Sequence, residues 1–227
     1  MERESLNLYS MPSRRSPKLS KSRRNLLLNG AIASAGVVGA IGLQAILPNS
    51  SDAASASDQA NDIAILNNAL YYEHQAIWAY SFAAGKLTNT EVGKAVLEIA
   101  LRNQADHKQH RDLLARAVSS LGGKPVAAEA SYDVSAYLKN GEGNLDSDVN
   151  IARLALALET DAAIAYTQEV AKLKTPNLIT AGASIGSTES AHATAIRAAF
   201  KSLGMNLNVV PSAFISTQNR SSWILTV

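Results

Sequence analysis

The chain carries one eight-residue pattern twice, and each copy places a glutamate inside an apolar stretch. Residues 73–80 read EHQAIWAY and residues 159–166 read ETDAAIAY, with the glutamate, two alanines and the final tyrosine at matching positions. A buried ionised carboxylate costs on the order of several kcal/mol unless it is paired or bound to a metal. Glu73 and Glu159 therefore predict a core in which a cation, protons or water offset their charge.

A histidine is repeated in the same way. His110 and His192 each stand at the same distance before a Leu-Gly pair, and this alignment sets Glu189 opposite His107. The spacing of three residues puts Glu189 and His192 on one face of a helix, so both side chains can reach the same ion.

The ligand types narrow the choice of metal. Imidazole and carboxylate together suit iron, manganese or zinc. The chain has no cysteine, which excludes disulfides, thiolate metal sites and cysteine nucleophiles. The lack of sulfur ligands also argues against copper(I) and iron–sulfur clusters.

Four helices are predicted to position these side chains. Apolar residues recur at spacings of three and four over about residues 63–80, 96–121, 148–173 and 178–203. Glycines follow the second and fourth stretches and Pro176 precedes the fourth, as is usual at helix ends and starts. Each of the four stretches carries polar residues on the face that it should bury.

The connections predict the order of packing. Only a few residues join the first helix to the second and the third to the fourth, so each pair should form an antiparallel hairpin. The segment 124–147 between the pairs is long enough to run the length of a bundle. The fold class is therefore all-α, a four-helix bundle over residues 57–205 with one long crossover between helices two and three.

This arrangement resembles the ferritin-like carboxylate bundles that hold two iron or two manganese ions. Two helices of such bundles each give a glutamate, and each of the other two gives a Glu-x-x-His motif. The resemblance covers about residues 60–205 and is closest to the exported bacterial ferritin-like domain proteins. It implies iron or manganese in the core and oxidoreductase chemistry toward dioxygen, peroxide or ferrous iron. The implied metal ligands are Glu73, His110, Glu159, Glu189 and His192.

The second helix departs from the family pattern. It reads His107-x-x-His110 where Glu-x-x-His is expected, so the carboxylate that usually bridges both metals is missing. Asp106 is one substitute, since it lies four residues before His110. Alternatively His107 is a terminal ligand, which leaves Glu189 as the only bridge or leaves a single bound metal. A further alternative is a metal-free helical envelope protein with a polar, hydrogen-bonded core and a structural, stress-tolerance or binding role.

Other polar residues near the motifs are expected to have lesser roles. Tyr80 and Tyr166 lie two turns beyond their glutamates and are interpreted as core tyrosines with satisfied hydroxyls. His74 and Asp161 point about 100° round their helices from the glutamates, so neither is expected to contact a metal directly.

The first 56 residues resemble a twin-arginine export signal. Arg23 and Arg24 stand directly before an apolar run that lasts to about Leu47. The small residues 54–56, Ala-Ser-Ala, give a cleavage site that would start the mature chain near Ser57. The alternative is an uncleaved membrane anchor formed by residues 26–47. The protein is thus expected outside the cytoplasm, with the twin-arginine export machinery as a partner.

Charge separates this segment from the rest. Residues 1–56 hold seven Lys and Arg against three Asp and Glu, and the remainder holds 14 against 16, a net charge of −2. Nothing in the mature chain therefore indicates nucleic-acid binding. Metal ions are the expected partners, with dioxygen or peroxide as reactants, and an oligomer is compatible with the sequence. The tail, residues 206–227, is expected to pack on the bundle.

Overall fold

The computed structural model describes residues 55–227. The proposed twin-arginine motif and the apolar run 26–47 lie outside the described residues. Among the described residues, no helix is both long enough and apolar enough to cross a membrane.

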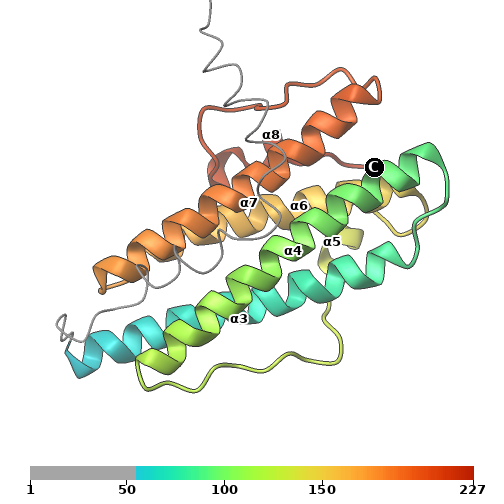
Figure 1. Ribbon diagram of the computed structural model, residues 1–227. Coiled ribbons are helices and arrows are strands. Elements are labelled where there is room, and N and C mark those ends of the chain that lie inside the picture. Colours follow the sequence, from blue (N-terminus) through green and yellow to red (C-terminus); the bar gives the residue numbers. More distant parts are fainter. Residues whose placement is uncertain (1–54) are drawn as a thin grey trace, which may run out of the picture. The chain divides into compact units, whose positions relative to one another are not determined.

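Four long helices form the bundle and confirm the predicted all-α class (Figure 1). They are α3 (Ala56–Ala84), α4 (Glu91–Ser120), α6 (Asp148–Val170) and α7 (Pro176–Ser202). Helices α3 and α4 form one hairpin and α6 and α7 form the other, with the long crossover running between them. The crossover also contains a short helix, α5 (Ser135–Lys139), which the sequence pattern did not predict.

Local signals account for the helix ends. The side chains of Ser55, Thr90 and Ser147 accept hydrogen bonds from backbone N–H groups in the first turns of α3, α4 and α6. Gly122 and Gly204 follow α4 and α7 with φ of 81° and 93°, a left-handed conformation that glycine adopts without a steric penalty.

Two apolar clusters form the core, and a polar layer separates them. The first cluster joins α3, α4 and α7, and the second joins α6, α7 and the tail. Along α7, Ile185 belongs to the first cluster and Ala193 to the second, with Glu189 between them. The glutamate is fully buried, so the polar layer that contains it lies between two apolar clusters.

Two aspartates join one hairpin to the other in matching ways. Asp62 on α3 accepts hydrogen bonds from the backbone N–H groups of Lys174 (2.9 Å) and Thr175 (3.0 Å), just before α7. Asp148 on α6 accepts from the N–H group of Thr88 (2.8 Å), just before α4. Asp62 and Asp148 are as far apart in the chain as the two repeated glutamates, so the internal repeat extends to the joints between the hairpins.

The tail returns along α6 and α7. It contains a 3-10 turn, η1 (Thr217–Asn219), and a short helix, α8 (Arg220–Trp223). Trp223 is buried in the second apolar cluster. Arg220 pairs with Glu142 of the crossover (2.7 Å) and with Asp161 of α6 (2.8 Å).

Candidate metal centre

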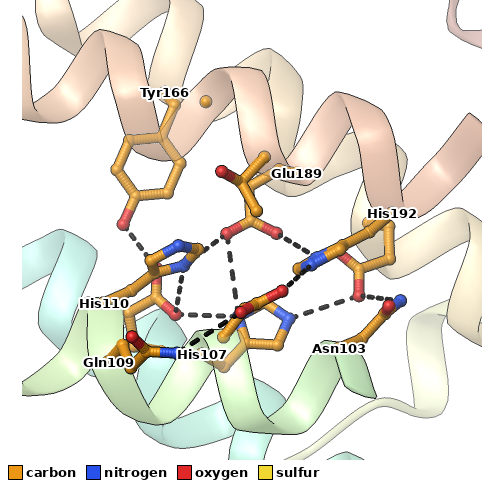
Figure 2. A network of polar contacts seen from close by, with 12 residues as sticks. Asn103, His107, Gln109, His110, Tyr166, Glu189 and His192 are labelled. Atoms are coloured by element: carbon orange, nitrogen blue, oxygen red, sulfur yellow. Dashed lines mark hydrogen bonds and ion pairs between the residues drawn. The ribbon is translucent and has the colours of Figure 1, made fainter. Parts of the chain in front are cut away.

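The polar layer brings together six of the seven residues predicted as metal ligands. All four long helices contribute, and the side chains converge in a network of polar contacts (Figure 2). This network lies between the two apolar clusters. The six residues are Glu73 from α3, His107 and His110 from α4, Glu159 from α6, and Glu189 and His192 from α7.

These residues form two overlapping groups, in each of which the ligand atoms lie within 4.8 Å of one another. The first group comprises Glu73, His107, His110 and Glu189. Its shortest contacts join His107 Nδ1 to Glu73 Oε2 (2.8 Å) and His110 Nδ1 to Glu189 Oε1 (2.9 Å).

The second group comprises His107, Glu159, Glu189 and His192. His107 Nε2 lies 3.2 Å from Glu159 Oε1, and His192 Nδ1 lies 3.2 Å from both Glu159 Oε2 and Glu189 Oε2. Glu189 gives one oxygen to each group, and His107 gives one ring nitrogen to each. These two residues therefore stand in the bridging positions.

One contact in the first group lacks the geometry of a hydrogen bond. His110 Nδ1 and Glu189 Oε1 are buried and only 2.9 Å apart, yet neither has a hydrogen-bond partner in the described structure. Buried polar atoms are otherwise almost always bonded. Two buried ligand atoms at this distance, without a hydrogen bond between them, leave room for a shared cation, and the donor set suits iron or manganese.

Comparison with known proteins identifies the fold family. The chain matches the ferritin-like domain family over residues 61–202. It belongs to that family. One solved structure that is similar to this ferritin-like domain is a conserved hypothetical protein, rv2844, from Mycobacterium tuberculosis, with a TM-score of 0.54 and 22% identity. The match covers 69% of this chain and 99% of that one, and at this identity it supports the fold alone. No curated protein matches the chain.

The two repeated tyrosines connect the halves of the ferritin-like domain. Tyr166 donates a hydrogen bond to Glu73 Oε1 (2.5 Å), and Tyr80 donates to Glu159 Oε1. The tyrosine of each repeat thus bonds the glutamate of the other repeat. The hydroxyls are satisfied, as expected for core tyrosines, and their partners are the candidate ligands. Asn103, which no sequence motif singles out, donates to the Tyr80 hydroxyl (3.0 Å) and to Glu159 Oε1 (3.3 Å).

Asp106 lies outside both groups of the ferritin-like domain. Its Oδ2 atom is 3.2 Å from His192 Nε2, the ring nitrogen that faces away from the glutamates, and its Oδ1 atom is 2.7 Å from Arg102 Nη1. Carboxylates in this position orient a ligand histidine and fix its tautomer. The structure therefore places Asp106 behind His192, and the position of the missing bridge is filled by His107.

Two residues near the motifs have partners elsewhere. His74 Nε2 lies 3.3 Å from the backbone oxygen of Val126, and Asp161 pairs with Arg220. Both therefore lie away from the centre, as their angular positions on the helices predict.

Without a metal, protonated histidines balance the negative charge of the glutamates in the centre. Burial disfavours charge on His110 and His192, but contacts with the glutamates outweigh it and raise the pKa to about 9 and about 10. Burial likewise disfavours charge on Glu73, yet His107 and His110 lower the pKa of this carboxyl to about 2. Burial raises the pKa of Glu189, although His107 opposes the rise. Protons on the histidines thus take the place of a cation.

Proposed function

We propose that this ferritin-like protein binds iron or manganese in the bundle core and uses the metal for redox reactions with dioxygen, peroxide or ferrous iron. The observation that carries the proposal is the pair of buried ligand groups drawn from four helices, with two ligand atoms left without hydrogen bonds. Burial of this many ionisable groups is costly unless an ion or protons balance them.

Each ligand has a defined part in this proposal. Glu73 and His110 would help to hold one ion and Glu159 and His192 another, and Glu189, which belongs to both groups, would offer one oxygen to each. A bound iron or manganese ion would supply the one-electron chemistry that the side chains alone lack.

The surrounding residues prepare the ligands for this task. The hydroxyls of Tyr80 and Tyr166 hold the two repeated glutamates in fixed orientations. Asp106 contacts His192 Nε2, the ring nitrogen that faces away from the glutamates, and so orients the ring. The apolar clusters on either side lower the local polarity, which strengthens electrostatic interactions inside the layer.

Ferrous oxidation tests the proposal. Anaerobically prepared protein is mixed with ferrous iron and air, and the rate is compared for wild type, Glu159→Ala and the control Glu98→Ala, which changes an exposed glutamate of α4. The proposal expects wild type and Glu98→Ala to oxidise iron at equal rates above the buffer, with Glu159→Ala close to the buffer. Equal rates in all three proteins would remove the redox claim.

A metal-free structural role is a second candidate, favoured by the internal pairing of charges. Each buried glutamate of the centre contacts at least one histidine within 3.2 Å, so protons can balance the core. This role predicts that Glu189→Gln lowers the melting temperature, because His110 and His192 lose a buried partner, and that added metal does not alter the melting temperature. A rise in melting temperature with manganese in wild type, lost in Glu189→Gln, would favour the metal.

We further propose export through the twin-arginine route, supported by Arg23, Arg24 and the apolar run after them. Mass spectrometry of protein recovered from the cell envelope should show a chain that starts near Ser57. A full-length chain in the membrane fraction would instead support the anchor 26–47. A full-length chain in the cytoplasm would contradict export.

A further inference from the structure

A cavity of about 390 Å³ opens between α3 and α6, beside the candidate metal centre. Glu73, His107 and Glu159 lie on its wall, together with Tyr80 and Tyr166. Pockets that bind small molecules have volumes of about 300–1,000 Å³ and a few polar groups in a mainly apolar lining. The cavity therefore has the size of a small-molecule site that reaches the ligand glutamates.

Alanines of the repeated motif form this space. Ala76 and Ala79 on α3 and Ala162 and Ala165 on α6 all line the cavity. They are the two alanine positions that the eight-residue copies share. Because a methyl group is the smallest side chain after glycine's hydrogen, alanine at these four positions fills little of the space between α3 and α6 and leaves the cavity open. The repeat thus encodes both the carboxylates and the space beside them; we call this space the alanine groove.

The charges along the alanine groove select against anions. The described residues that line it include no lysine or arginine. His107, its one cationic group, is already paired with Glu73 and Glu159. The lining also includes Asp161 and Glu169, which pair with Arg220 and Lys172 outside the lining. An anionic ligand would leave water for a site with no free counter-charge, which is costly.

We propose that the alanine groove binds an uncharged, mainly apolar small molecule. A single hydroxyl on that molecule would donate toward the repeated glutamates or the tyrosine oxygens, and its hydrocarbon part would lie against the alanines. As a substrate site the groove rests on the proposed function. As a binding site it does not, because its walls, mostly from α3 and α6, need no bound metal to form.

Calorimetric titration of the full chain with 1-octanol and with octanoate tests the charge and the shape of the groove. The two probes share a carbon chain and differ in charge. Wild type should bind octanol at least about tenfold more tightly than octanoate. Ala79→Leu, which fills the groove, should weaken octanol binding by about tenfold or more. Ala162→Leu should do the same from the opposite wall, and Ala105→Leu, an exposed change on α4, should have no effect.

Several results would overturn the proposal. One is octanoate binding that is as tight as octanol binding, and another is octanol binding that both groove variants retain. A third is a wild-type protein that binds no octanol and is a dimer, which Ala79→Leu converts to a monomer. In the last case the groove is an interface between two copies of the chain. Melting curves followed by circular dichroism show whether each variant is folded. If Ala79→Leu does not fold, the octanol affinity of Ala162→Leu tests the proposal.

Metal content measured on the same samples separates this proposal from the proposed function. Octanol binding by protein that takes up no iron or manganese would support the groove and contradict the metal centre. Metal uptake without octanol binding would support the metal centre and contradict the proposed groove.

Discussion

His107 makes the two halves of the centre unequal. Its Nδ1 atom faces Glu73 and its Nε2 atom faces Glu159. A neutral imidazole has one lone pair, because its other nitrogen carries a proton. The ring can therefore serve as a ligand in only one group at a time, whereas a carboxylate could serve in both.

This inequality predicts the binding of two ions with different affinities. Anaerobic calorimetry with manganese should show a first ion bound at least about tenfold more tightly than a second. His107→Glu supplies an oxygen to each group and should bring the two affinities closer together. The control His74→Glu changes a histidine outside the centre and should behave as wild type. Two equal affinities in wild type would contradict this account of His107.

The crossed tyrosine bonds predict matched effects on stability. Tyr80→Phe and Tyr166→Phe each remove a hydrogen bond to a buried glutamate. Each should lower the free energy of unfolding by about 1–3 kcal/mol in metal-free protein, measured by urea denaturation. Tyr72→Phe, at a half-exposed tyrosine of α3, should change it little. A loss in only one of the two tyrosine variants would argue against the symmetric arrangement.

At the scale of elements, the two aspartate joints fix how the hairpins meet. Asp148 accepts hydrogen bonds from the Thr88 N–H group (2.8 Å) and from the hydroxyls of Thr88 (2.5 Å) and Thr90 (3.0 Å). At the other joint, Asp62 accepts two backbone hydrogen bonds, from the N–H groups of Lys174 and Thr175. Each aspartate ties the start of one helix to the loop of the opposite hairpin, which sets the register of the polar layer.

Removal of a joint should destabilise the fold in a pH-dependent way. Asp148→Ala should lower the free energy of unfolding by about 1–3 kcal/mol at pH 7, and Asp112→Ala, at an exposed residue of α4, should not.

Hydrogen bonds from Thr88 hold the pKa of Asp148 below its ordinary value of 3.8. A lowered pKa in the folded state gives stability that is complete above the unfolded value and is lost as the pH falls. The gap between wild type and Asp148→Ala should therefore shrink below about pH 4. A gap that is constant down to pH 2 would contradict this role.

The sequence predicted the helices better than the connections. Spacing of apolar residues predicted all four long helices, and the length of segment 124–147 predicted the crossover. Helix α5 was missed because five residues are too few to show a period. Asp62 and Asp148 were also missed, although they repeat at the same separation as the glutamates. That separation was the signal that could have found them.

The residues of the site could be predicted from the sequence, but the contacts between their atoms could not. The repeat pointed to the six residues that converge, because helical spacing decides which side chains share a face. Spacing does not decide which ring nitrogen faces which oxygen, since packing sets the rotamers. The position of Asp106 behind His192 and the bridging position of His107 therefore came only from the structure.

At the scale of the whole molecule, the tail closes one end of the bundle core. Trp223 fills the second apolar cluster, and the buried Arg197 donates to the backbone oxygens of Trp223 and Asn208. Trp223→Ala should lower the free energy of unfolding by about 3–5 kcal/mol without a change in metal content, because the polar layer lies outside this cluster. Phe214→Ala, at a tail residue that is 75% exposed, is the control. Urea denaturation that gives equal stabilities for both variants would show that the tail does not support the core.

The central claim is that the polar layer holds a metal, and elemental analysis tests it most directly. The protein should be purified from its native host without chelators, in wild-type form and as Glu189→Ala, which removes a residue shared by both groups. The account predicts between one and two iron or manganese ions per wild-type chain and a marked loss in Glu189→Ala, with Glu98→Ala equal to wild type. Wild-type protein that holds neither metal, even after anaerobic loading with ferrous iron, would contradict it.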